Sequence, residues 1–130
     1  MALRCLIVDD SRRFLHAARA LLEQEGLTEV DLASDGAEAL RLAEQFKPDV
    51  ALVDIELGGE NGFDLARRLT GETGLTSSSL ILISTHSEED FQDLIAASRV
   101  AGFLPKSHLS LEAIREIVRD SDGGDPSDGS

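Results

Sequence analysis

The sequence predicts an α/β fold in which a parallel β-sheet carries helices on both of its faces. Short apolar runs alternate along the chain with longer segments in which apolar residues recur at helical spacing, and this alternation occurs five times. Most of the apolar runs are continuous, as in strands that are buried on both sides. Right-handed crossovers return each such strand beside an earlier one, so we expect a doubly wound sheet of parallel strands.

The first two strand-helix units lie in the N-terminal part of the chain. A buried strand is expected over residues 3–8, and the helix that follows it has Gly26 as its stop signal. Strict alternation over residues 28–34 indicates a half-exposed strand, and residues 35–46 read as an amphipathic helix with acidic residues toward its start. Pro48 ends that helix.

The other units repeat the pattern as far as residue 120. In chain order they are a buried strand over 49–54, a turn over 55–62, a helix from residue 63, a buried strand over 80–84, a helix over 87–98 with Ser87 as its N-cap, a short strand over 102–106 and a helix over 110–120. We therefore expect one domain over residues 1–120. Residues 121–130 contain no apolar anchor and are expected to form a disordered tail or the start of a linker.

Charge and cysteine content exclude several classes of function. The 12 basic and 25 acidic residues give a formal net charge of -13, which repels phosphate backbones and anionic membrane surfaces. We expect no direct binding of nucleic acid and no membrane association. The single cysteine, Cys5, lies in the first apolar run and is interpreted as a buried thiol, which fits the reducing cytoplasm. No apolar stretch approaches the roughly 18 residues that a membrane span requires.

Polar side chains stand where several predicted strands end. Asp9 and Asp10 follow the first strand, Asp54 ends the third, Ser84 and the adjacent Thr85 end the fourth, and Lys106 ends the fifth. In open α/β sheets, ligands bind outside the carboxyl ends of the strands. If these strands are neighbours, the side chains form one site at that edge.

The charge balance of this site favours a divalent cation. Three carboxylates would face one ammonium group, and a cation relieves the excess of negative charge. Mg²⁺ fits best, because it prefers oxygen ligands and keeps coordination positions free for a phosphoryl group. Zinc fits poorly, because Cys5 is expected in the core and His16, His86 and His108 have no recognisable ligand spacing.

Four motifs occur together at these strand ends: "LIVDDS" (6–11), "VALVDIELGGENGFDL" (50–65), "LILISTHS" (80–87) and "GFLPK" (102–106). Through them the chain resembles the receiver domain of two-component response regulators, from Leu3 to about Asp120. The resemblance implies a flavodoxin-like receiver fold with five parallel strands in the order 2-1-3-4-5. It also implies a cytoplasmic signalling domain that accepts a phosphoryl group from a sensor histidine kinase.

The resemblance assigns roles to the strand-end residues. It makes Asp54 the phosphoacceptor, Lys106 a bridge between Asp54 and the phosphoryl oxygens, and Ser84 a hydrogen-bond donor to one of those oxygens. Asp10 and Asp54 would bind Mg²⁺ directly, and Asp9 would act through metal-bound water. Phosphoryl transfer requires mainly positioning and charge neutralisation from a protein, and these residue types supply both.

Further roles fall on residues around the site. The backbone carbonyl of Glu56 would complete the metal shell. Phe103 matches the aromatic switch position and is expected to turn inward as Ser84 closes on the phosphoryl group, although it also suits a simple core aromatic. Glu56, Thr85 and His86 occupy positions that tune the lifetime of the phosphoryl group, while plain solvent exposure is the alternative for Glu56 and His86.

The sequence departs from the commonest family pattern at several places. "ELGGENG" stands after Asp54 where many members have methionine and proline, so we expect a looser loop. Pro105 precedes Lys106 instead of following it, which leaves the isomer of the Lys106–Ser107 peptide open. Ser84 replaces the commoner threonine.

The leading functional hypothesis is a phosphorylated signalling switch that assists its own phosphorylation and dephosphorylation without being an enzyme in its own right. The face formed by the fourth helix, fifth strand and fifth helix would change on phosphorylation and regulate a downstream protein or a fused output domain, with a homodimer through this face as a further option. The alternatives are an aspartyl-nucleophile phosphatase or phosphotransferase, and a receiver-like binding module without phosphorylation. The first alternative needs a second aspartate just beyond the nucleophile as general acid, where this chain has Glu56.

Overall fold

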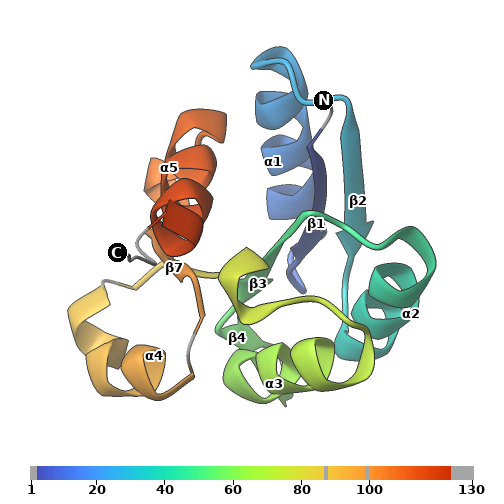
Figure 1. The fold of residues 1–130 in the computed structure, drawn as a ribbon. Coiled ribbons are helices and arrows are strands. Elements are labelled where there is room, and N and C mark those ends of the chain that lie inside the picture. The colour runs from blue at the N-terminus through green and yellow to red at the C-terminus, as the bar shows by residue number, and fades with distance from the viewer. Residues whose placement is uncertain (1–2, 87, 99, 124–130) are drawn as a thin grey trace.

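The computed structural model describes residues 3–86, 88–98 and 100–123, which form a single parallel sheet between two helical layers (Figure 1). The strands of this sheet are β1 (Arg4–Val8), β2 (Glu29–Ala33), β3 (Val50–Asp54), β6 (Leu80–Ser84) and β7 (Gly102–Pro105). They are parallel and follow the order β2-β1-β3-β6-β7. Numbered as strands of this sheet alone, the order is the predicted 2-1-3-4-5, so the doubly wound fold is confirmed.

Each face of the sheet carries its own set of helices. The helices are α1 (Arg12–Gln24), α2 (Gly36–Phe46), α3 (Gly62–Glu72), α4 (Gln92–Ser98) and α5 (Leu111–Gly123). Helices α1 and α5 cover one face, and α2, α3 and α4 cover the other (Figure 1). Residues of β3 alternate between the two cores, with Leu52 facing α1 and α5 and Val53 facing α2 and α3. All of β3 is buried, which explains its continuous apolar sequence.

Local signals set several helix ends. Ser11, Asp35 and Asn61 cap α1, α2 and α3, and each side chain accepts a hydrogen bond from a backbone N–H of the first turn. Gly26 follows α1 with a φ of +111°, a conformation that glycine adopts without strain. Lys47 ends α2 in the left-handed region at φ +49°, immediately before Pro48.

Two predicted segments within the chain differ from the structure. Residues 55–62 were expected to form a turn, but they contain the antiparallel hairpin of β4 (Glu56–Leu57) and β5 (Glu60–Asn61), because Gly58 adopts the positive φ of +61° that a tight connection requires. Instead of one helix over 87–98, a 3₁₀ helix over Glu88–Phe91 precedes α4, as is frequent at helix N-termini. The proposed cap Ser87 lies outside the described residues.

The C-terminal helix is longer than predicted. α5 continues past residue 120 as far as Gly123, the last residue that the structure describes. The remainder of the predicted tail, residues 124–130, lies outside the described residues.

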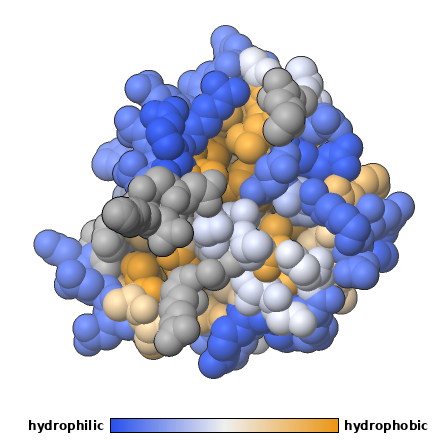
Figure 2. Space-filling view, in the orientation of Figure 1, coloured by the Kyte–Doolittle hydropathy of each residue, from blue (hydrophilic) through white to orange (hydrophobic). Residues whose placement is uncertain are grey.

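Hydrophilic residues dominate the periphery of the face shown in Figure 2, and apolar residues are visible mainly between the helices. Cys5 is fully buried, as predicted. Among the described residues, Leu94 of α4 is the one large apolar side chain with high exposure, at 54%. No helix in the described ranges has the length and apolar character needed to cross a membrane.

Two glycines of α3 provide a matched test of the packing between this helix and β3. A Cβ atom at Gly62 would lie 2.1 Å from the backbone oxygen of Asp54, whereas a Cβ at Gly71 would meet nothing within 4 Å. We expect Gly62→Ala to destabilise the protein by about 1–3 kcal/mol, as overpacking does. Gly71→Ala is expected to stabilise it by up to about 1 kcal/mol, because alanine favours the helix. Urea unfolding of both variants checks the opposite signs, and equal effects would contradict the close approach at Gly62.

Candidate functional site

Three carboxylates meet at the carboxyl edge of neighbouring strands. Asp9 and Asp10 follow β1, Asp54 ends β3, and these two strands pair directly. One oxygen from each carboxylate lies within 4.8 Å of the others. Asp9 is fully buried and Asp54 is 5% exposed, while Asp10 is exposed. The structure therefore brings together the three acidic residues that the sequence singled out.

Backbone groups hold two of these carboxylates in place. The N–H of Ser11 donates to Oδ1 of Asp9 at 2.8 Å, and the N–H of Glu56 donates to Oδ1 of Asp54 at 3.1 Å. The start of α3 supports the second contact, because the N–H of Gly62 donates to the Ile55 carbonyl at 2.8 Å. Both carboxylates thus have one oxygen fixed and the other directed toward the shared site.

Lys106 supplies the positive charge of the site. It follows β7 and extends across β6, so that Nζ lies 2.5 Å from Oδ2 of Asp9 and 3.2 Å from Oδ2 of Asp54. Its side chain is only 14% exposed. Burial disfavours the charged form, but the contacts with Asp9 and Asp54 outweigh burial and raise the pKa of Lys106 above its ordinary value. The ammonium group therefore stays protonated at neutral pH.

The surroundings of Asp54 disfavour its charged form. Burial is the largest influence and, together with the charge of Asp9, raises the pKa of Asp54 to about 6, although the Glu56 N–H and Lys106 act to lower it. Burial and like charge dominate even with an ammonium group in contact. At neutral pH Asp54 is mainly a carboxylate, held in a site that would gain from more positive charge.

The donor set suits a cation that prefers oxygen ligands. Oδ2 of Asp9 is buried and has no hydrogen-bond partner of good geometry among the described residues, so its ion pair with Lys106 leaves bonding capacity unused. A Cβ atom at Gly58 would lie 3.3 Å from Oδ2 of Asp10, so the hairpin passes close to the carboxylates. Cys5 is in the core, away from this edge. The residues present fit Mg²⁺ and do not resemble a zinc site.

Ser84 and His86 line the side of the site nearest β6. Oγ of Ser84 accepts a hydrogen bond from the His86 N–H at 3.0 Å, and Ser84 is almost completely buried. The His86 ring contacts the end of β6 and the segment after β3: its Nδ1 lies 3.4 Å from Oγ of Ser84 and 3.5 Å from Oε1 of Glu56. Thr85 is exposed. In this conformation Ser84 is directed toward His86, and Glu56 and His86 face each other across the site.

Comparisons with known proteins agree with this geometry. The family model described as the response regulator receiver domain matches residues 5–119. The chain belongs to this family. PilH of Pseudomonas aeruginosa is 40% identical over 86 residues, which cover 66% of this chain and 70% of PilH. The signal receiver domain of the response regulator NarL from Mycobacterium tuberculosis is 29% identical, with a TM-score of 0.75 over 94% of this chain and 98% of that one.

Longer response regulators are also similar to this receiver domain. LiaR of Bacillus subtilis, a transcriptional regulatory protein, is 27% identical over 95% of this chain and 58% of its own length. The response regulator GacA of Pseudomonas aeruginosa is 28% identical over 90% of this chain and 54% of its own. The chain therefore spans little more than half of these two relatives.

Three features of the receiver domain bear on the family pattern. Phe103 is 9% exposed and packs in the core cluster that α2, α3 and α4 cover, so its ring is already inside the protein. The Lys106–Ser107 peptide is trans, because the described ranges contain no cis bond. The loop after Asp54, where the usual methionine and proline are missing, contains a short antiparallel hairpin.

Sequence reasoning missed two residues that contact the site or its loop. The Phe14 ring lies under the Lys106 ammonium, with Nζ 4.5 Å from the ring centroid. Oε1 of Glu60, in β5, accepts a hydrogen bond from the Gly36 N–H at 2.9 Å and ties the hairpin to the start of α2. No signal in the sequence links either residue to its partner.

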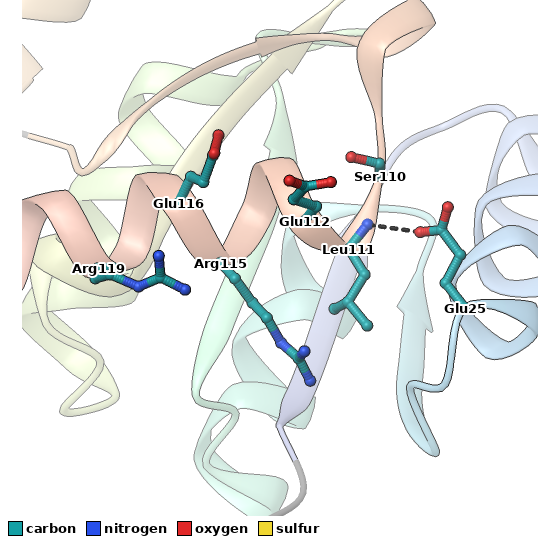
Figure 3. Close-up of a pocket in the computed structure, with 7 residues that line it drawn as sticks. All are labelled: Glu25, Ser110, Leu111, Glu112, Arg115, Glu116 and Arg119. Atoms are coloured by element: carbon teal, nitrogen blue, oxygen red, sulfur yellow. Dashed lines mark hydrogen bonds between the residues drawn. The ribbon is translucent and has the colours of Figure 1, made fainter.

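One hollow of the structure, of about 410 Å³, lies apart from these residues, between the end of α1 and α5. Figure 3 shows Glu25, at the end of α1, opposite the first turns of α5, which carry Arg115 and Arg119. Oε1 of Glu25 accepts a hydrogen bond from the Leu111 N–H at 2.7 Å and satisfies one of the free donors at the start of α5. This contact has a structural explanation, and the carboxylate edge remains the candidate functional site.

The raised pKa of Asp54 has a measurable consequence for stability. The folded carboxyl holds its proton up to about pH 6, whereas the unfolded chain releases it near the ordinary value of 3.8. The folded state thus binds more protons between these values, and the contribution of Asp54 to stability falls as pH rises through this window. Asp54→Asn should therefore stabilise the protein at pH 7 but give little benefit near pH 4. Urea midpoints from pH 4 to 7 test this, with Glu44→Gln on the exposed side of α2 as the control for loss of a charge.

Proposed function

We propose that this receiver domain is a signalling switch that accepts a phosphoryl group on Asp54 from a sensor histidine kinase. The observation that carries the proposal is the contact of Lys106 Nζ with Oδ2 of Asp54 at 3.2 Å, beside two further carboxylates. An isolated strand-end aspartate often caps a helix, and such a residue requires no buried ammonium group. A nucleophile that must receive a negatively charged group does require one.

The transfer itself needs one bond to form and one to break. A carboxylate oxygen of Asp54 forms a bond to phosphorus, while the bond from phosphorus to the donor nitrogen of the kinase histidine breaks and its electron pair stays on that nitrogen. Lys106 neutralises charge on the phosphoryl oxygens, and the Glu56 N–H orients the Asp54 carboxylate. At neutral pH the pKa of about 6 leaves Asp54 ionised and ready to react.

The proposed cofactor is Mg²⁺. Asp10, Asp54 and the backbone carbonyl of Glu56 would hold it directly, and Asp9 would hold it through water. When bound, the ion would neutralise further charge on the phosphoryl oxygens. The buried Oδ2 atom of Asp9 without a good hydrogen bond, and the excess of carboxylates over ammonium groups, support this assignment.

The output of the switch is proposed to pass through the face formed by α4, β7 and α5. Ser84 would leave its contact with His86 and donate to a phosphoryl oxygen, and the packing of Phe103 beneath that face would adjust. Glu56, Thr85 and His86 are proposed to set the lifetime of the phosphoryl group, because they are exposed and closely follow the strand ends that carry Asp54 and Ser84. The changed face would regulate a protein partner, a fused output domain or a second copy of the chain in the cytoplasm, without direct binding of nucleic acid or membrane by this domain.

An aspartyl phosphatase is the alternative that the geometry disfavours. Its general acid would have to come from Glu56, the residue two positions after Asp54. The Glu56 side chain is exposed and faces His86 at 3.5 Å. The domain is therefore proposed to be regulatory, and the next experiment also separates it from a binding module that takes no phosphoryl group.

Incubation with acetyl phosphate and Mg²⁺ should add the mass of one phosphoryl group to the protein. Asp54→Asn removes the nucleophile and should abolish labelling, whereas Glu44→Gln should label normally. Intact-mass spectrometry measures both results. Normal labelling of Asp54→Asn, or no labelling of the unmodified protein, would refute Asp54 as the phosphoacceptor.

Mg²⁺ should stabilise the folded protein, because the metal binds a site that exists only in the folded state. At ten times its dissociation constant the expected stabilisation is about 1.4 kcal/mol, or a rise in melting temperature of roughly 3–6 °C. Asp10→Asn should remove most of this rise, and Glu44→Gln should retain it. Thermal denaturation with and without millimolar Mg²⁺ provides the measurement, and an equal rise in all three proteins would argue against a specific site.

A further inference from the structure

We infer that Phe14 is a positioning residue for phosphoryl transfer, because its ring holds the Lys106 ammonium group over Asp54. The inference rests on the proposed function of Asp54 and adds a residue on α1 to the machinery of the site. It starts from the distance of 4.5 Å between Lys106 Nζ and the centroid of the Phe14 ring. A cation at this distance over an aromatic face is attracted by the negative charge of that face.

The contact belongs to a closed series of interactions around Asp9. Oδ1 of Asp9 accepts from the Ser11 N–H at 2.8 Å, and Oγ of Ser11 accepts from the Phe14 N–H at 3.2 Å. The Phe14 ring then contacts Lys106, and Lys106 Nζ returns to Oδ2 of Asp9 at 2.5 Å. The helix cap at Ser11 thus fixes the backbone of Phe14 relative to the same carboxylate that Lys106 contacts.

An aromatic ring is well suited to hold this particular cation. Lysine carries a strongly hydrated ammonium group on a flexible stem of four carbons, so its position must be restrained from outside. A further carboxylate would restrain it but would add negative charge next to the incoming phosphoryl group. The ring attracts the ammonium group and adds no net charge. It also excludes water from one side of Lys106, which strengthens the remaining charge interactions.

The importance of the ring increases when a cation occupies the carboxylates. Asp9 holds Lys106 in the present structure, and Asp9 is also expected to turn toward metal-bound water. Asp54 and the Phe14 ring are then the restraints that remain among the contacts described for Nζ. The Phe14 ring has no atom that could bind a metal. It would therefore keep its contact with the ammonium group when Asp9 turns toward the metal-bound water.

The competing explanation is that Phe14 only fills space between α1 and the sheet. The ring is partly buried and packs against the core cluster under α1 and α5, so some of its role is structural. Phe14→Leu separates the two explanations, because leucine keeps apolar volume but has no aromatic face. Phe14→Met is a second variant of this kind, and Phe14→Tyr keeps the ring.

The test compares initial rates of labelling by acetyl phosphate and Mg²⁺. Phe14→Leu and Phe14→Met should be labelled roughly three- to tenfold more slowly than the unmodified protein, and Phe14→Tyr should recover most of the rate. Phe46→Leu is the matched control, because Phe46 lies 5.8 Å from the guanidinium carbon of Arg4 in a similar contact outside the site. It should leave the labelling rate unchanged.

A double-mutant cycle shows whether the ring acts through Lys106. In a Lys106→Met background, Phe14→Leu should cause no further slowing, since the cation that the ring holds is gone. An equal slowing in both backgrounds would show that Phe14 acts elsewhere and would overturn the inference. So would a normal rate for Phe14→Leu in otherwise unmodified protein. Failure of the unmodified protein to label refutes the proposed function itself, which is a distinct result.

Discussion

The contact between one ammonium group and two buried carboxylates is the interaction on which the site depends. Asp9 and Asp54 end adjacent strands and lose most of their hydration, which would leave two unpaired charges in the protein without Lys106. Lys106 follows β7, which is separated from β3 by β6, so the contact also links the end of β7 to the ends of β1 and β3. Even so, the pKa of Asp54 remains raised, and the site still favours additional positive charge.

The sequence predicts the parts of this arrangement that local patterns encode. β6 occupies Leu80–Ser84, as its apolar run indicates, and the strand ends bring Asp9, Asp10, Asp54 and Lys106 together. The hairpin over residues 56–61 was missed because its strands have two residues each, too few to show a period. The contact of Phe14 with Lys106 was missed for a different reason. It depends on the angle between α1 and the end of β7, which no local pattern contains.

The hairpin changes the interpretation of the unusual loop after Asp54. The sequence "ELGGENG" in place of the commoner methionine and proline suggests a looser loop, but hydrogen bonds hold both ends of the loop. Glu60 accepts a hydrogen bond from the start of α2, and the Gly62 N–H donates to the carbonyl of Ile55, the residue after Asp54. A Cβ atom at Gly36 would lie 2.4 Å from Oε1 of Glu60, so the missing side chain at Gly36 is what permits the first contact. The glycines therefore permit close approach and a tight turn, and the loop does not have to be mobile.

These contacts also explain how a small charge change at Asp54 could reach the surface. In this structure the groups around Asp54 contact one another: Lys106 contacts Asp9, Ser84 contacts His86, and His86 contacts Glu56. A phosphoryl group on Asp54 would compete for Lys106, which already contacts Oδ2 of Asp54, and it is proposed to compete for the Ser84 hydroxyl as well. Release of Ser84 would free the segment that leads through the 3₁₀ helix Glu88–Phe91 into α4, and the Phe91 ring of that segment contacts the rings of Phe63 and His86. The same few donors thus stabilise the site in this structure and, under the proposed function, would carry the signal away from it by changing partners.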